Sequence, residues 1–72
     1  MMKKTDFRLL RVRHYYTRRV LALNVGVKPD TVRSWENGAR RPSLPVLSRM
    51  REYFPGADLL GMFYPEYAQT HN

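Results

Sequence analysis

Apolar and polar residues follow one another along this chain with a helical period. Apolar side chains recur at spacings of three and four residues, and residues typical of turns separate the periodic segments. No segment has the pattern of two strands joined by a hairpin turn. The sequence therefore predicts an all-α fold of five helices: a first helix capped by Thr5 or Asp6, and further helices over about 18–25, 29–36, 44–54 and 57–63.

Capping and turn residues define the ends of these helices. Thr17 and Ser43 are the predicted N-caps of the second and fourth helices. Gly26 follows the second helix, where a left-handed residue is favoured. Pro29 suits the first position of the third helix, because its missing N–H has no intrahelical partner there. The third helix is expected to stop at the Asn37-Gly38 turn.

The same spacing predicts which side chains form the core. These are Phe7, Leu10, Arg11 and His14 in the first helix, Leu21, Ala22 and Val25 in the second, Val32 and Trp35 in the third, and Leu44, Leu47, Met50 and Phe54 in the fourth. The chain has 72 residues and no internal repeat. We therefore expect one domain over 1–72, with a core over about 6–64 and a frayed tail at 68–72.

Composition narrows the setting of the protein. Cysteine is absent, which excludes disulfides and Cys-ligated zinc and fits a reducing cytosol. No apolar run approaches the roughly 18 residues of a membrane span. Met1–Thr5 holds two lysines but no apolar stretch follows, so no signal peptide is predicted. We expect a cytoplasmic protein that does not enter a membrane.

The charge of the chain is strongly positive and unevenly placed. Thirteen Lys and Arg residues against six Asp and Glu give a net charge of +7, and eleven of the thirteen precede Pro42. From Pro55 onward there are acids and aromatic residues but no Lys or Arg. Such a charge favours a polyanionic partner, which is nucleic acid, an anionic membrane or an acidic protein.

The segment 17–38 is the most informative part of the sequence. A helix of about eight residues, a turn that opens with Gly26, and a second short helix form a helix-turn-helix unit. Ala22 is small, which lets the second helix of the unit cross close above it. Val32 is apolar where it fills the angle between the helices, and Trp35 anchors the unit on the core.

An ordered set of residues gives this segment a family resemblance. The set is Leu21-Ala22, Gly26-Val27, Val32, Trp35-Glu36-Asn37-Gly38 and Pro42-Ser43. It resembles the Cro- and repressor-type (XRE) helix-turn-helix family over about Phe7 to Leu60. The resemblance implies a five-helix, lambda-repressor-like domain that binds double-stranded DNA as a transcriptional regulator, specifically a repressor. It also implies that the third helix enters the major groove.

Candidate base contacts lie on the side of the third helix opposite Val32 and Trp35. They are Lys28, Pro29, Asp30, Arg33 and Ser34. Arg33 suits a bidentate contact with guanine, Asp30 can accept from a cytosine amino group, and Ser34 can do either. Pro29 offers only an apolar contact, such as one to a thymine methyl group.

Candidate phosphate contacts flank that helix. They are Thr17, Arg18, Asn37, Arg40 and Arg41. The resemblance implies phosphate contact at Arg18. The alternative is that the arginine pairs at 18–19 and 40–41 are merely solvated. The resemblance further implies a structural ion pair between Arg11 and Glu36.

The chain departs from the family pattern at several positions. Lys28 stands where relatives usually have Ser or Thr as a cap, and lysine cannot accept the capping hydrogen bond, which costs about 1 kcal/mol. Asp30 favours the helix dipole but opposes non-specific binding to phosphates. Tyr15 and Tyr16 replace a loop residue and an apolar residue; we expect Tyr16 at the core boundary and Tyr15 exposed.

Two further surfaces are candidates for protein contacts. Tight binding is expected to need a homodimer on a pseudo-palindromic site, because one helix covers only a few base pairs. The predicted dimer interface is Leu59, Met62, Phe63 and Tyr64, and the alternative is that Phe63 and Tyr64 fold onto their own core. A stripe of Leu9, Val12 and Tyr16 is either a partner surface or a sign that the first helix is wrongly phased. The second candidate function is therefore a protein–protein adaptor or antitoxin-type inhibitor.

No catalytic constellation is evident. The acidic residues do not gather around a histidine, and His14 has no second ligand at a metal-binding spacing, so it is interpreted as a boundary histidine. We therefore expect no enzyme activity, cofactor, metal or small-molecule substrate.

Overall fold

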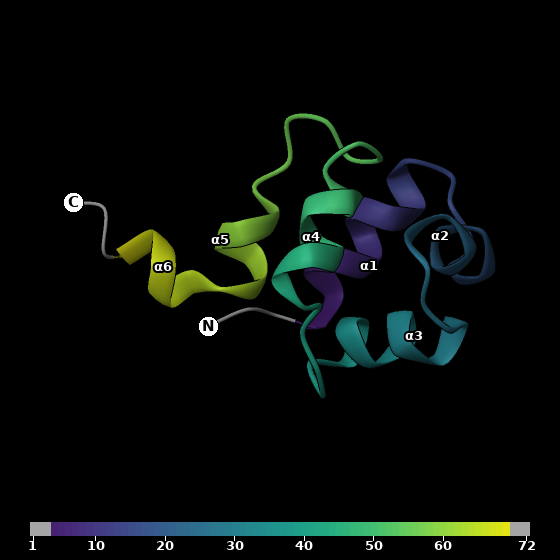
Figure 1. The fold of residues 1–72 in the computed structure, drawn as a ribbon, viewed down its shortest axis with the longest axis horizontal. Helices are drawn as coiled ribbons and strands as arrows, with labels where there is room; N and C mark the ends of the chain where they lie inside the picture. The colour runs from purple at the N-terminus through teal and green to yellow at the C-terminus, as the bar shows by residue number, and fades with distance from the viewer. Residues whose placement is uncertain (1–3, 70–72) are drawn as a thin grey trace.

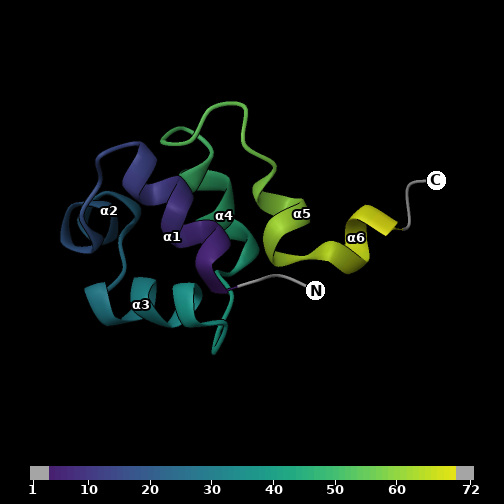
Figure 2. The ribbon, with the colours of Figure 1, turned by 180° about the vertical axis from the view of Figure 1, so that it is seen from behind.

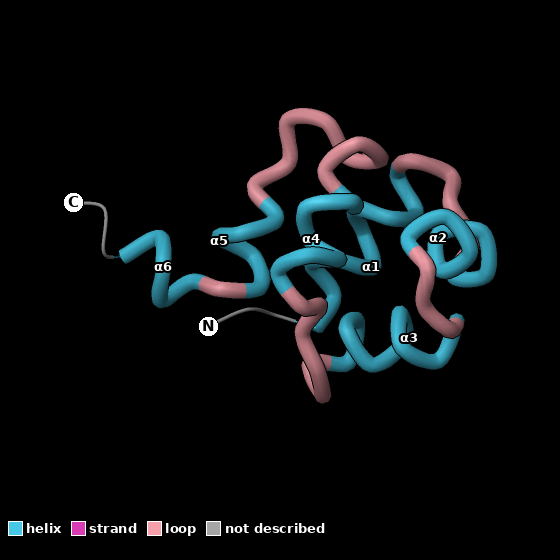
Figure 3. Tube along the Cα trace, viewed as in Figure 1, coloured by secondary structure: helices cyan, strands magenta, loops and turns pink. Residues whose placement is uncertain are grey.

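The computed structural model describes residues 4–69 as helices joined by loops, with no strand in that range (Figure 3). The helices are α1 (Lys4–Arg13), α2 (Arg18–Val25), α3 (Pro29–Asn37), α4 (Leu44–Met50), α5 (Leu59–Phe63) and α6 (Pro65–Gln69). The predicted all-α class is confirmed. Helices α1 to α4 surround one core, α5 covers a further side of it, and α6 extends from α5 at one end of the molecule (Figures 1 and 2).

Phe7 lies at the centre of the core. Its ring is fully buried and contacts Trp35, Phe54 and Phe63, with ring centroids 6.1, 5.7 and 5.2 Å away. The contacts with Trp35 and Phe54 are edge-to-face, an arrangement that aromatic pairs favour beyond simple burial. Because Trp35 belongs to α3 and Phe63 to α5, one α1 side chain holds the helix-turn-helix unit and the C-terminal segment together.

The predicted ends of the middle helices are confirmed. The Thr17 hydroxyl accepts a hydrogen bond from the Val20 N–H, and Ser43 accepts one from Val46. Gly26 and Gly38 end α2 and α3 in the left-handed conformation, at φ of 81° and 79°. Pro29 occupies the first position of α3. Local sequence therefore determines the boundaries of the helix-turn-helix unit.

Other boundaries differ from the prediction. Helix α1 begins at Lys4, so Thr5 and Asp6 lie inside its first turn and not at the position before it. Helix α4 ends at Met50 and not near Phe54, because the chain after it tightens into turns in which the Tyr53 N–H donates to the Met50 carbonyl oxygen at 2.9 Å. Phe54 is still buried, since the turn after α4 carries it inward.

Three predictions for the C-terminal half are also corrected. Leu44 is exposed, because it lies on the outer side of the first turn of α4. Helix α5 begins at Leu59 and not Ala57, because Asp58 caps it by accepting from Gly61 N. A sixth helix, α6, follows α5 at a place where the five-helix prediction has no element. Residues 70–72 lie outside the described range.

Candidate nucleic-acid interface

The outer face of α3 carries the predicted base contacts. Val32 and Trp35 are buried, which turns Asp30, Arg33 and Asn37 outward, where all three are exposed. Lys28 and Pro29 are exposed at the start of the helix. Ser34 is half-buried, and its hydroxyl donates to the Asp30 carbonyl oxygen at 3.1 Å. The structure thus gathers the predicted residues on one exposed face, with Ser34 partly engaged in its own helix.

The start of α3 lacks the usual side-chain cap. Lys28 occupies the N-cap position and makes no capping hydrogen bond, as the sequence predicts. Helix α2 holds the turn that precedes Lys28. The Val27 N–H and the Gly26 N–H both donate to the carbonyl oxygen of Ala22, in α2, at 2.9 Å. The entry into α3 is therefore fixed by the end of α2.

A buried carboxylate joins three helices behind this face. Glu36, with a side chain only 2 % exposed, accepts from Arg11 Nε through Oε2 and from Arg18 Nε through Oε1, the latter at 2.9 Å. Arg11 also donates to the Tyr16 carbonyl oxygen at 2.6 Å. The expected ion pair of Arg11 with Glu36 is present, and Arg18 makes it a triad of one acid and two bases.

Arg18 has a structural role that the sequence did not reveal. Its Nε atom binds Glu36, eighteen residues along the chain, and its side chain remains 41 % exposed. A guanidinium has five N–H donors, so a side chain held by one nitrogen can still present others to a phosphate. No local signal in the sequence indicated this contact, because Glu36 lies eighteen residues further along the chain.

The two arginines of the loop after α3 have different surroundings. Arg40 is exposed. Arg41 donates through one nitrogen to Glu66 Oε2 at 2.8 Å and to the Phe63 carbonyl oxygen at 3.2 Å. Its guanidinium also lies 3.9 Å from the centre of the Tyr64 ring, a cation–π distance. Arg41 therefore fastens the C-terminal segment, and a phosphate would have to share it with Glu66.

Arg49 is another basic residue whose role was missed. It donates to the Val25 carbonyl oxygen at 3.2 Å and so satisfies the end of α2. A Cβ atom at Gly26 would lie 3.1 Å from the same Arg49 nitrogen. Arg49 thus braces the turn of the helix-turn-helix unit from α4.

The C-terminal apolar residues contribute to the chain's own core. Leu59, Phe63 and Tyr64 are buried, and Met62 is half-buried against the same cluster. The Tyr64 hydroxyl donates to the Pro42 carbonyl oxygen at 2.7 Å. The alternative considered from the sequence, that Phe63 and Tyr64 fold onto their own core, is therefore the one observed, because Phe63 packs against Phe7.

Two of the three residues of the predicted apolar stripe are exposed on α1. Leu9 and Val12 are 52 % and 47 % exposed, so the first helix is correctly phased at these positions. Tyr16 instead turns inward and contacts Phe54 and Tyr53, with ring centroids 5.6 and 6.1 Å away. Tyr16 lies beyond the last residue of α1, so its side chain does not follow the helical periodicity that places Leu9 and Val12 on one side. His14 lies at the boundary as expected, with its Nδ1 3.0 Å from the Leu10 carbonyl oxygen.

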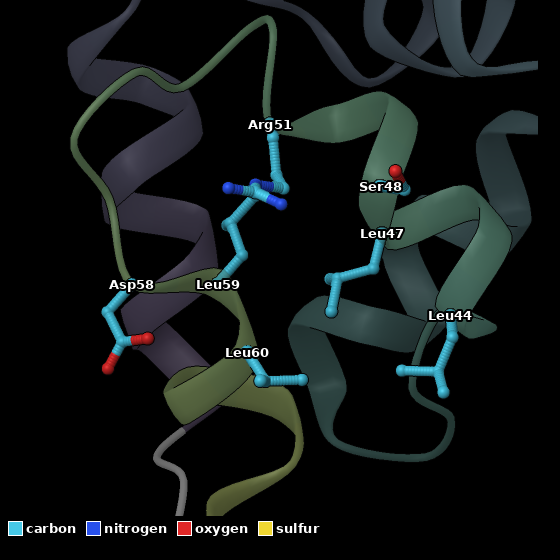
Figure 4. Close-up of a pocket in the computed structure, with 7 residues that line it drawn as sticks. All are labelled: Leu44, Leu47, Ser48, Arg51, Asp58, Leu59 and Leu60. Atoms are coloured by element: carbon cyan, nitrogen blue, oxygen red, sulfur yellow. The ribbon is translucent and has the colours of Figure 1, made fainter. Parts of the chain in front are cut away.

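A hollow of about 330 Å³ lies between α4 and α5 (Figure 4). Leu44 and Leu47 face Leu60 across it, while Arg51 extends from the end of α4 and Asp58 points away. All of its lining residues belong to α4, to the chain after it or to α5. It is therefore separate from the outer face of α3.

Within residues 4–69, no cluster of His, Cys, Asp or Glu has the composition of a metal site. In the same part of the chain, no helix has the length and apolar character needed to cross a membrane.

The fold and this face define a helix-turn-helix domain. The sequence profile described as Helix-turn-helix matches residues 7–59. The chain belongs to that family, of the Cro- and repressor-type, and membership implies DNA binding. The family is one of DNA-binding domains that are typically non-catalytic. The search of curated proteins and the search of solved structures gave no match.

Proposed function

We propose that this protein is a transcriptional repressor that binds specific sites in duplex DNA by placing α3 in the major groove. The observation that carries the proposal is the outer face of α3, where Arg33 and Asp30 are exposed on a helix whose inner side is locked by buried Trp35 and Glu36. A rigid helix with exposed hydrogen-bonding side chains is what sequence recognition in the major groove requires.

The charge around this face supports a polyanionic partner. Arg33 and Arg40 are exposed, and Arg18 is partly exposed. We assign Arg33 to a guanine, Asp30 to a cytosine amino group, and Arg18, Arg40 and Thr17 to phosphates. The matched family profile supports DNA as the polyanionic partner, since DNA is the polyanion that such domains bind.

The first test is the salt dependence of binding. With several phosphate contacts, log K for duplex DNA should fall linearly with log salt, with a slope of about 0.9 per contact. Fluorescence anisotropy with a labelled duplex over a salt series measures this slope. Affinity that stays constant between low and physiological salt would refute the proposal.

The second test separates base contacts from phosphate contacts. Arg33→Ala should remove about 1–3 kcal/mol of discrimination between a selected site and a scrambled duplex. Arg40→Ala, the matched control in the loop after α3, should weaken both duplexes equally and lower the salt slope by about one contact. Equal weakening of both duplexes by Arg33→Ala would show that Arg33 contacts no base.

We also propose that the protein binds as a homodimer on a pseudo-palindrome. The centres of the half-sites should then lie one helical turn apart, roughly 34–36 Å. Of the predicted interface residues, Met62 alone keeps a half-buried side chain, so the interface must draw on other exposed residues as well. Sedimentation equilibrium with and without DNA tests this: one protomer on a footprint of full length would contradict the dimer.

A second candidate function is supported by the exposure of Leu9 and Val12. An adaptor or antitoxin-type inhibitor would use this stripe and would tolerate loss of the arginines around α3. A double Arg33→Ala, Arg40→Ala variant that keeps its biological activity would therefore favour the adaptor over the repressor.

A further inference from the structure

Helices α1, α2 and α3 are each followed by a residue in the left-handed backbone conformation. After α2 and α3 the chain turns at Gly26 and Gly38, with φ of 81° and 79°. After α1 the same left-handed conformation falls on Tyr15, at φ of 63°. The Tyr16 N–H then donates back to the Arg11 carbonyl oxygen at 3.2 Å, which closes the end of α1. The conformation of residue 15 is therefore explained by the end of the helix.

The choice of tyrosine at this position is not explained by the fold. A bulky L-residue is disfavoured in the left-handed region, where glycine is at ease. Tyr15 as a whole residue is 94 % exposed, so burial of its ring does not offset the strain. At the equivalent positions after α2 and α3 the chain has glycine, which adopts the left-handed conformation without strain. A strained residue that contributes nothing to packing points to a role in binding.

The surroundings of Tyr15 indicate what it would bind. Together with Val12, Thr17 and Arg18 it lines an open hollow of about 420 Å³, where the chain passes from α1 into α2. Arg11, Arg18 and Glu36 leave this corner with a net positive charge. The contact of Arg18 with Glu36 also ties the corner to the end of α3, at 2.9 Å. An anionic ligand that reaches α3 is therefore well placed to reach Tyr15.

We infer that Tyr15 contacts the sugar–phosphate backbone of duplex DNA beside the start of α2. Its hydroxyl donates to a phosphate oxygen, and its ring lies against the neighbouring deoxyribose. The inference rests on the proposed DNA binding and adds to it a residue that carries no charge. Because phosphates carry no sequence information, this contact adds affinity for every duplex alike.

The test uses two substitutions that differ in their effect on the fold. In Tyr15→Gly the strain and the side chain are both removed, so the melting temperature should rise by about 4 °C or more, while affinity for a mixed-sequence duplex falls at least tenfold. In Tyr15→Phe only the hydroxyl is removed, so the melting temperature should stay unchanged and affinity should fall about tenfold, the effect of one hydrogen bond to a charged group.

Salt dependence and a control variant complete the experiment. The slope of log K against log salt should stay that of the natural protein in Tyr15→Phe, because a neutral hydroxyl releases no counterion. Tyr67→Phe, which alters a tyrosine of α6 at the opposite end of the molecule from α2, should leave the affinity as it was (Figure 1). Anisotropy titration measures the affinity and its salt slope, and thermal unfolding monitored by circular dichroism measures the melting temperature.

The outcomes separate this inference from the proposal on which it rests. A natural protein that binds no duplex refutes the DNA-binding proposal itself. Tight binding by the natural protein and equally tight binding by both Tyr15 variants overturns the inference alone, and would turn attention to a protein partner at this corner. A fall in melting temperature in Tyr15→Gly would also overturn it, since the ring would then be supporting the fold.

Discussion

Two glutamates in this protein bind arginine in contrasting settings. Glu36, in α3, has a side chain 2 % exposed and holds Arg11 and Arg18. Glu66, in the C-terminal segment, has a side chain 49 % exposed and holds Arg41. The first contact joins the helices behind the proposed DNA-binding face. The second, between Arg41 and Glu66, joins the loop after α3 to α6.

The difference in burial separates a structural contact from an adjustable one. A buried carboxylate cannot be hydrated, so losing its partners leaves an uncompensated charge and costs several kcal/mol, about 3–5. A half-exposed ion pair exchanges readily with water and salt. We therefore expect Glu36 to control whether the domain folds, and Glu66 to influence only how firmly α6 and Arg41 are held.

The largest predicted effect is on the buried triad. Glu36→Ala should lower the free energy of unfolding by about 3 kcal/mol, because Arg11 is left buried beside no acid. Arg11→Ala should cost less, since Arg18 still neutralises Glu36. The double variant should cost less than the sum of the two single variants, because neither charge is then left buried without its partner. Urea unfolding of the four proteins gives each value.

The exposed Arg40 supplies the control for this cycle, and Arg40→Ala should leave the free energy of unfolding within about 0.5 kcal/mol of the natural protein. The Glu36→Gln variant keeps the size of the side chain and serves if Glu36→Ala does not fold. Simple additivity of the two alanine substitutions would mean that Arg11 and Glu36 do not depend on one another.

The helix-turn-helix unit was predictable because its signals are local. Thr17, Gly26, Pro29 and Gly38 each act within a turn of the chain, and the structure places every one in its predicted role. The exposed side of α3 follows from the position of Trp35 alone. Contacts between distant segments were not predictable in the same way. Nothing near Arg18 or Arg41 in sequence shows that each binds a glutamate eighteen or twenty-five residues away.

The C-terminal segment was predicted less well for a related reason. Helix α5 has only five residues, which is too short for the spacing of apolar residues to show which side of the helix is buried. Whether Phe63 and Tyr64 turn inward depends on the space that α1 and the loop at Pro42 leave for them. That space is a property of the packed fold, and the sequence alone does not show how large it is. The start of α6 did carry a signal, since Pro65 precedes Glu66 at a helix start.

A smaller effect is expected where the C-terminal segment meets the loop between α3 and α4. Tyr64→Phe removes the buried hydroxyl that donates to the Pro42 carbonyl oxygen and leaves that acceptor without its partner. The free energy of unfolding should fall by about 0.5–1.5 kcal/mol. Tyr15→Phe removes an exposed hydroxyl and should not change it. Equal values for the two variants in urea unfolding would mean that the Tyr64 contact adds nothing to the attachment of α5.

The smallest effect should come from Glu66 and should depend on pH. A hydrogen bond from its own backbone N–H, and then the Arg41 guanidinium, lower the pKa of the Glu66 carboxyl, although partial desolvation opposes them. Because the folded pKa lies below the unfolded one, the stabilisation is fully present above the ordinary glutamate value of about 4.3 and is lost as the pH falls through the folded pKa. Glu66→Gln should abolish this dependence while reducing stability less than Tyr64→Phe does. It should also release Arg41, so that DNA binding becomes tighter at low salt and the gain disappears as salt rises.

Carbon-13 NMR titration of the Glu66 carboxyl in the natural protein and in Arg41→Ala tests the cause: the pKa should rise in the variant but stay below the ordinary value, because the backbone hydrogen bond remains. An unchanged pKa in Arg41→Ala would show that the two side chains do not interact in solution, and the contrast with Glu36 would then be complete.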